Sequence, residues 1–287
     1  MNMLDLYTYH LRDCGLSGDE ARRVAQCRAA KPTRVGTIRA EKTEGESSEA
    51  TLDLYDSIGF DFWTGEGMTP KRLAEQLDAL KPFDRLTVRV NSPGGDVFDG
   101  MTIYNILRRQ EATVAVEIEG LAASAASFII QAASPGEIAV NEASMLMIHR
   151  AWGVGMGNFQ DMLDLAGVLE KLDGQIAGIY SARSKRKVDT WLGLMDSETW
   201  FTGAEAVDAK LADKVIPAKR AAALADPSAL NAYRNVPAGL ADRLKALADD
   251  ERREQEEAAV RERERAEREQ EAVRVRLRCV ELEAEVA

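Results

Sequence analysis

The chain has 287 residues, 45% of them hydrophobic, and is therefore long enough to bury one substantial core and to carry appended segments. Its net charge of −11 argues against nucleic acid as a partner, because binding to phosphates requires a basic surface. No run of about eighteen apolar residues is present, and the first residues lack the pattern of a secretory signal, so we expect no membrane partner.

The N-terminal part, residues 1–50, is polar and ends in the acidic, serine-rich run EKTEGESSEA. This composition buries too little apolar surface to order the chain and is typical of a flexible linker. We therefore predict that residues 1–50 form a polar N-terminal segment and linker that precede a folded domain.

Strands and helices are predicted to alternate over residues 51–219. The run TLDLYD has the period-2 apolarity of a strand. Thr69 and Pro70 are residue types that begin a helix, and Thr202 and Glu205 have the spacing of a capping box. This alternation implies an α/β domain with mostly parallel strands. The expected strands lie at 51–56, 85–91, 113–119, 137–140, 144–149 and 213–216, and the expected helices begin near 70, 101, 121, 158 and 203.

The C-terminal part, residues 240–287, is dominated by Glu, Arg and Ala and contains neither Pro nor Gly. Charge pairs at i,i+4 support a solvated helix or a weak coiled coil, and no heptad of apolar residues is sustained across the segment. We predict a charged, helical, scaffold-like tail at 240–287. Residues 220–239 are predicted to link this tail to the domain.

Ser124 is a candidate nucleophile. It lies in GLAASAAS, shortly after the predicted strand TVAVEIE and at the expected start of a helix. Free backbone N–H groups and the helix dipole at such a position stabilise a negatively charged oxygen. The alanines around Ser124 leave room for a peptide, although small residues of this kind are also typical of a closely packed helix.

His149 is the candidate general base. It follows the apolar run SMLMI, and the other histidine, His10, precedes the predicted linker. A single histidine after a strand often serves packing alone, but a serine–histidine enzyme would have to use this one, with a pKa near the ordinary value of about 6.5. Because Cys14, Cys27 and Cys279 are scattered and only two histidines are present, we expect neither a metal site nor a cofactor.

The turn NSPGG, between a predicted strand and a predicted helix, contains two glycines that can expose consecutive N–H groups to an oxyanion. An ordinary strand-to-helix turn can have the same residues. The turn alone therefore does not indicate an oxyanion site.

Three blocks taken together resemble the signature blocks of the Clp protease proteolytic subunit family. They are VNSPGGDVFDGMTIY, EGLAASAAS and MLMIH, and the closing run TWFTGAEAVDAKLADKVI is also similar to that family. The resemblance covers about residues 51–216. It implies a Clp-protease/crotonase-like fold of repeated β-β-α units, here followed by a charged helical extension, and assembly into a homo-oligomeric ring.

Carried over position by position, Ser124 matches the nucleophile of the family and His149 matches its base. The backbone N–H groups of Gly95 and Ala125 match the donors to the oxyanion. The run WGVGMGN resembles the strand that pairs with bound peptide, and the long helix from Asn158 resembles the helix through which rings stack.

The third member of the triad is carried over to Asp196, which precedes the TWF block in MDSETWF. The chain is shorter than the family pattern at this point, so Glu198 is a competing acid. A solvated loop acid or a helix cap is the alternative role for Asp196.

Two features depart from the housekeeping subunits. The family usually has proline soon after the histidine, where this chain has Arg150, Ala151 and Trp152, and a charged tail is appended. The MxxETWF pattern and the tail resemble the Clp-related head maturation proteases of tailed bacteriophages. This implies cleavage of scaffolding and capsid proteins inside the prohead, in the cytoplasm of an infected bacterial host, with self-cleavage as a further activity.

Three other functions remain open from the sequence. A crotonase-type acyl-CoA enzyme would share the fold but would use acidic residues in place of the serine–histidine pair. A serine–lysine peptidase would not require His149. An assembly scaffold with a vestigial protease domain would account for the charged tail.

Overall fold

The computed structural model describes residues 40–43, 48–60, 67–217, 230, 233–240, 242 and 253. The chain divides into one compact unit, Met1–Leu244, and a second, Lys245–Ala287. Most of the predicted tail and most of the predicted N-terminal segment lie outside the described residues. None of the helices within these ranges is long and apolar enough to cross a membrane.

The strands are β1 (Ala40–Thr43), β2 (Glu49–Tyr55), β3 (Gly59–Phe60), β4 (Gly67–Met68), β5 (Arg85–Ser92), β6 (Thr113–Ala123), β7 (Ile138–Asn141), β8 (Met145–Ile148), β9 (Thr199–Thr202) and β10 (Lys214–Ile216). The helices are α3 (Pro70–Leu80), α4 (Val97–Arg108), α5 (Ala125–Ile129), the 3-10 helix η1 (Ile130–Ala132), α6 (Phe159–Ser184), α7 (Val188–Asp196) and α8 (Gly203–Asp208).

The main sheet has the strand order β1-β2-β5-β6-β7-β10. Along this order the neighbours from β2 to β10 run parallel, and β1 pairs antiparallel with β2. Strands β8 and β9 extend the same sheet: β8 pairs parallel with β6, and β9 pairs antiparallel with β8. This confirms the predicted α/β class with mostly parallel strands. Strand β1 falls within the segment that was expected to be a linker, where its pairing with β2 orders it.

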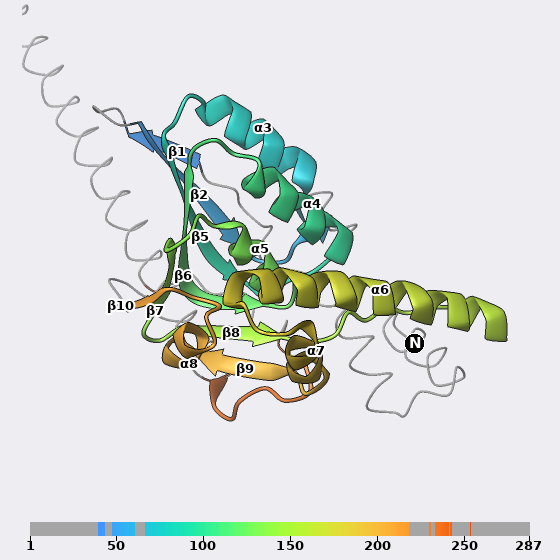
Figure 1. Cartoon of the computed structure of the whole chain (residues 1–287). Coiled ribbons are helices and arrows are strands. Elements are labelled where there is room, and N and C mark those ends of the chain that lie inside the picture. The colour runs from blue at the N-terminus through green and yellow to red at the C-terminus, as the bar shows by residue number, and fades with distance from the viewer. Residues whose placement is uncertain are drawn as a thin grey trace, which may run out of the picture. The chain divides into compact units, whose positions relative to one another are not determined.

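Helices α3, α4 and α5 lie on the same side of the sheet (Figure 1). In α3, Thr69 caps the helix by accepting a bond from the Arg72 N–H, and Pro70 occupies its first turn, as predicted. The apolar face of α3 is buried in the core. Its fully or nearly fully buried members are Leu73, Leu77 and Leu80.

Strand β6 is longer than predicted and serves two partners. Residues 116–118 pair with β7, whereas residues 121–123, expected to begin a helix, pair with β8. The apolar, small residues of this stretch fit a buried strand as well as a buried helix, so periodicity alone could not separate the two. The helix α5 therefore begins only after Ser124, directly at the end of the strand.

Two elements near the C-terminal end of the domain were not predicted. Helix α7 packs on α6 and buries Trp191, and β9 pairs antiparallel with β8. By contrast, the predicted capping box of Thr202 and Glu205 is present at the start of α8. The run WGVGMGN, which was expected to resemble a peptide-pairing strand, contains no strand in this described range.

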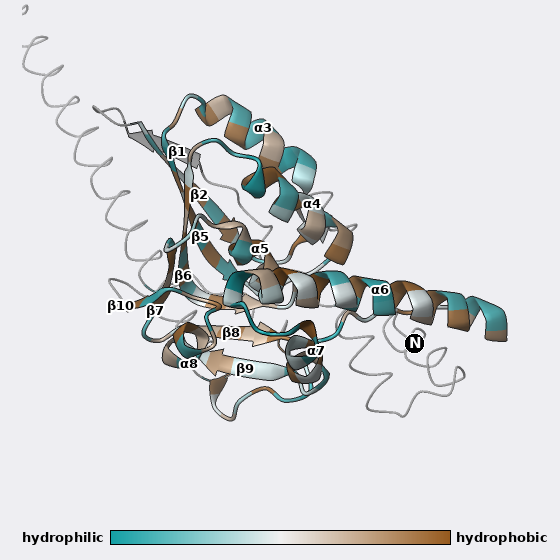
Figure 2. Ribbon diagram, in the orientation of Figure 1, coloured by the Kyte–Doolittle hydropathy of each residue, from teal (hydrophilic) through white to brown (hydrophobic). Residues whose placement is uncertain are grey.

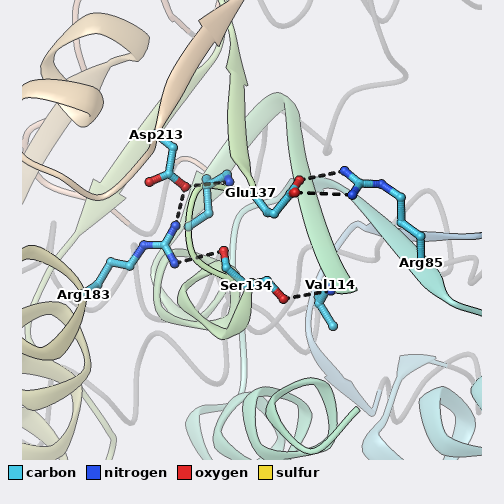
Figure 3. Close-up of polar contacts among 7 residues, drawn as sticks. Arg85, Val114, Ser134, Glu137, Arg183 and Asp213 are labelled. Atoms are coloured by element: carbon cyan, nitrogen blue, oxygen red, sulfur yellow. Dashed lines mark hydrogen bonds and ion pairs between the residues drawn. The ribbon is translucent and has the colours of Figure 1, made fainter. Parts of the chain in front are cut away.

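Charged side chains link the start of β5 to the start of β7, and the C-terminal end of α6 to the residue before β10 (Figure 3). Arg85 of β5 pairs with Glu137, just before β7, at 2.7 Å. Arg183 of α6 is bonded to the Asp213 carboxylate, which also accepts the Ile138 N–H at 2.8 Å. These bonds attach α6 and the segment before β10 to the edge of the sheet.

Helix α6 is capped by Asn158 and Asp161 and extends past the packed helices (Figure 1). Its second half is buried at Ile176, Ala177 and Tyr180. Its first half carries apolar bands that no described element covers, as Figure 2 shows along the projecting part. The exposed apolar residues there include Phe159, Met162, Leu163 and Val168.

Candidate active site

The carboxyl ends of β5, β6 and β8 meet at one edge of the sheet. Ser92 of β5 pairs with Ala122 of β6, and Ala123 of β6 pairs with Met147 of β8. Because these pairings are parallel, the residues that follow each strand come together. The predicted glycine turn, the predicted nucleophile and the predicted base are those residues.

Ser124 occupies a sharp turn between β6 and α5, with φ 52° and ψ −122°. This conformation is rare for a residue with a side chain and is found at strained functional sites. Two bonds maintain it: the Ser124 N–H donates to Met147 O at 3.0 Å, and the Ser127 N–H donates to Ser124 O at 3.0 Å. Ser124 is partly exposed, whereas the residues from Leu121 to Ala133 around it are buried.

His149 follows β8 and lies against the nucleophile. Its Nε2 atom and the Oγ atom of Ser124 are 2.8 Å apart, a hydrogen bond that fits a base receiving the hydroxyl proton. The pKa of His149 is lowered to about 4, mainly because burial disfavours the imidazolium. The Glu198 charge raises this pKa and the Arg234 charge lowers it. The prediction of an ordinary pKa for His149 was therefore wrong, because the sequence alone does not show that the imidazole ring is buried.

The glycine turn lies directly beside the nucleophile. Gly94 has φ +93°, and a Cβ atom there would lie 2.6 Å from the Ser124 Cβ and 2.8 Å from the Ala125 N. Gly95 has φ +152°, and a Cβ atom there would lie 2.0 Å from Ile58 O. Only glycine fits these positions. The structure thus brings the Gly94 backbone next to Ser124 and the Ala125 N, whereas Gly95 packs against Ile58.

Asp196, the acid carried over from the family pattern, ends helix α7 and faces Arg150. Its two carboxylate oxygens accept bonds from Arg150 Nε and Nη2 at 2.7 and 2.9 Å. This bidentate pair lowers the pKa of Asp196. Arg150 also reaches Asp173 of α6 at 3.2 Å, and Asp173 accepts the Ala151 N–H at 2.7 Å. Asp196 therefore takes part in a charged link among α6, α7 and the residue after His149.

Glu198 is the carboxylate whose charge acts on His149. It lies between α7 and β9 with φ 47°, a second strained residue at this site, and is 8% exposed. Its carboxylate accepts the Arg234 N–H at 2.8 and 2.9 Å and the Asn235 N–H at 2.6 Å. Within the described part of the chain, no hydrogen bond joins the His149 ring to Glu198 or Asp196. Of the two acids named from the sequence, Glu198 acts on the His149 ring through its charge, and Asp196 pairs with Arg150.

Tyr233 is a residue of the site that sequence reasoning missed. Its ring meets the His149 ring edge-on, with centroids 5.4 Å apart and planes at 88°. It lies in the stretch predicted to be a linker. The one signal in that stretch is Tyr233 itself, a large aromatic residue among small and polar ones, which is typical of a packed segment. No group of three or more metal-ligating side chains is found among the described residues.

Known proteins resemble this chain over the same region. A model of the Clp protease family matches residues 69–219. The ATP-dependent Clp protease proteolytic subunit of Bacteroides fragilis is 30% identical over 140 residues, which cover 49% of this chain and 68% of that subunit. Proteolytic subunit 1 of Prochlorococcus marinus subsp. pastoris is 28% identical over 184 residues, or 61% of this chain and 94% of that subunit. The subunit of Porphyromonas gingivalis is 29% identical over 144 residues, which cover 50% of this chain and 65% of that subunit.

The matched region contains the glycine turn, the sharp turn at Ser124 and His149, which the fold brings together. It also extends over slightly more than half of the chain. The segment from residue 220 onward, including Tyr233, lies outside it. The sheet, the site and these relatives together show that the chain belongs to the Clp protease family, whose proteolytic subunits are serine peptidases.

Proposed function

We propose that this protein is a serine endopeptidase in which Ser124 is the nucleophile and His149 the general base. The observation that carries the proposal is the 2.8 Å contact between Ser124 Oγ and His149 Nε2 at a strained, partly exposed turn. His149 would take the hydroxyl proton as Oγ attacks the peptide carbonyl, and would then give that proton to the leaving amine. Water would then attack the acyl group on Ser124. His149 would take a proton from that water and return it to Ser124 Oγ as the acid product leaves.

The developing oxyanion would be held by the N–H groups of Gly95 and Ala125. The close approach of the glycine turn to Ser124 supports this assignment. A single donor of this kind contributes about 3–4 kcal/mol to transition-state stabilisation. The donors belong to the backbone, so the turn conformation, and not a side chain, sets their positions.

The imidazolium formed during the reaction would be stabilised by Glu198. The supporting observations are its burial and the effect of its charge on the His149 pKa. Asp196, the other candidate, forms a salt bridge with Arg150, and its side chain is largely exposed. A crotonase-type or serine–lysine reaction would leave the Ser124–His149 bond without a role.

We further propose that the substrates are scaffolding and capsid proteins of a tailed bacteriophage, cleaved within the prohead in the cytoplasm of an infected bacterial host. The support comes from the MxxETWF pattern and from the charged segment at 240–287, which lies beyond the region matched by the family. A scaffold-like tail would bring the peptidase into the prohead, and its removal by self-cleavage would follow. The same tail would serve an assembly scaffold with a vestigial protease domain, but such a protein needs no intact Ser124–His149 pair.

A homo-oligomeric ring is the assembly that we propose. Its support is the uncovered apolar surface on the projecting half of α6, which is costly to leave in water. Rings would place the sites in an enclosed space and restrict them to unfolded or extended substrates.

The proposed function is tested with full-length protein co-expressed with the capsid and scaffolding proteins. Wild type, Ser124→Ala and the neighbouring control Ser127→Ala are compared by intact mass over time. We expect cleavage with wild type and Ser127→Ala and none with Ser124→Ala. Cleavage by Ser124→Ala would refute the peptidase assignment. Cleavage of a short peptide by wild type, with capsid and scaffold left intact, would refute the head-maturation role alone.

A further inference from the structure

A short segment from beyond the family-matched region packs against the active site. Residues 233–240 follow β10 and lie outside residues 69–219. Leu230, Tyr233 and Leu240 are only 3%, 8% and 7% exposed. A solvated linker would leave such side chains in water, so this part of the chain is an element of the folded unit.

The Tyr233 side chain joins three parts of the site. Its ring packs edge-on to His149 and also to Trp200 of β9, with centroids 5.8 Å apart. Its hydroxyl donates to the carbonyl of Pro93, the residue that precedes Gly94 within the glycine turn. One side chain therefore contacts the base, the strand beside it and the turn that supplies the oxyanion donor.

The backbone that follows Tyr233 holds the carboxylate of the site. Arg234 and Asn235 donate their N–H groups to Glu198, at 2.6 to 2.9 Å, and the Asn235 side chain donates to Ser197 O at 2.9 Å. A carboxylate that is 8% exposed requires such donors, because a buried charge without them is strongly destabilising. The donors to the Glu198 oxygens thus include two that come from outside the region shared with the family.

We propose that Tyr233 and the N–H groups of Arg234 and Asn235 are positioning elements of this active site, which orient the His149 ring and the Glu198 carboxylate. This inference rests on the proposed peptidase function. The segment completes the site and does not block it, because the Ser124–His149 bond is intact and Ser124 stays partly exposed. An inhibitory segment is the alternative that the experiment separates.

The titration of His149 gives a readout that a purely structural role would not move. The groups that act on its ring are Ser124 through the hydrogen bond, Tyr233 through packing, and the charges of Glu198 and Arg234. Because burial is the main cause of its low pKa, removing the Tyr233 ring should raise that pKa from about 4 toward about 6.5.

The experiment uses full-length Tyr233→Ala, Tyr233→Phe and Tyr233→Leu. The His149 pKa is measured by NMR; the chain has only one other histidine, His10, so His10→Gln assigns the signal. The rate of labelling by a fluorophosphonate is measured from pH 5 to pH 9 on the same samples. We expect Tyr233→Ala to raise the pKa by at least about one unit and to slow labelling at neutral pH at least about tenfold. Tyr233→Phe keeps the ring, so its pKa should match wild type and its labelling should fall only a few-fold.

A second pair of variants tests the backbone donors. Asn235→Pro removes one N–H bonded to Glu198, whereas Asn235→Ala keeps it and loses only the side-chain bond to Ser197. We expect slow labelling in the proline variant and near-normal labelling in the alanine variant. If Tyr233→Ala does not fold by circular dichroism, Tyr233→Leu, which retains an apolar side chain, takes its place.

The outcomes separate the two proposals. Unchanged pKa and labelling in Tyr233→Ala and Tyr233→Leu would overturn the positioning role, and faster labelling would show that the segment inhibits. Absence of Ser124 labelling in wild type would refute the proposed function instead. The NMR titration would still report whether Tyr233 covers the base.

Discussion

Exchanging the Glu198 carboxylate for an amide tests which acid serves His149. Glu198→Gln keeps the size of the side chain and removes the charge that acts on the ring. In serine–histidine–acid triads, the corresponding change lowers turnover by about 10⁴-fold, or about 5.5 kcal/mol. Because no hydrogen bond joins Glu198 to the His149 ring among the described residues, we expect a loss of about 10²- to 10⁴-fold.

The same substitution should lower stability by an amount set by the backbone donors. One oxygen accepts the Arg234 N–H at 2.8 Å and the Asn235 N–H at 2.6 Å, and the other lies 2.9 Å from the Arg234 N. An amide group at the second position would face a donor, and the remaining bonds would lose their charge assistance. We expect a cost of about 1–2 kcal/mol, which is about 2–8 °C in Tm for a domain of this size.

The pH profile distinguishes loss of the charge from loss of folding. The Glu198 charge raises the pKa of His149, so its removal should lower that pKa below about 4 and move the acid limb of kcat/KM to lower pH. The assay is hydrolysis of a fluorogenic peptide from pH 3 to pH 9, with thermal unfolding measured in parallel. Asp196→Asn is the matched control and should stay within a few-fold of wild type. A larger loss in Asp196→Asn than in Glu198→Gln would contradict the reasoning and return the role to Asp196.

Four further predictions concern the rest of the molecule. Gly94→Ala should abolish peptide hydrolysis, since its Cβ would lie 2.6 Å from that of the nucleophile, whereas normal activity would place the oxyanion elsewhere. Ser127→Ala should lower stability by about 1–3 kcal/mol in denaturant unfolding, because it removes a buried hydroxyl bonded to Tyr180 at 2.6 Å, yet should leave fluorophosphonate labelling intact. Phe159→Asp on α6 should reduce the oligomer size in light scattering, and an unchanged size would exclude this surface from the assembly. Because the folded pKa of His149 lies below the unfolded value, stability should be complete above about pH 6.5 and fall by up to about 3 kcal/mol toward pH 4, a loss that His149→Asn should reduce.

The sequence predicted the α/β class and most elements because local signals coincided with tertiary structure. Thr69 and Pro70 begin α3, and the period-2 strands pair in parallel, as expected. The end of β6 was predicted to be helical because its small apolar residues fit either state. Its choice depends on the partner strand β8, which lies far along the chain.

The pairing of Ser124 with His149 was anticipated from the family blocks, and the structure places the two side chains in contact. The arrangement of carboxylates was not predictable. Asp196 and Glu198 are two residues apart, and only the turn after α7 decides which one acts on the ring through its charge and which one pairs with Arg150. Tyr233 was missed because its role depends on tertiary contacts with His149, Trp200 and Pro93, which no local pattern encodes.

The most direct test of the central claim is mass-spectrometric mapping of a fluorophosphonate label on the full-length protein. The account predicts a single adduct on Ser124, absent in Ser124→Ala, strongly slowed in His149→Ala and retained in Ser127→Ala. An adduct on another residue, or equal labelling of His149→Ala and wild type, would contradict it.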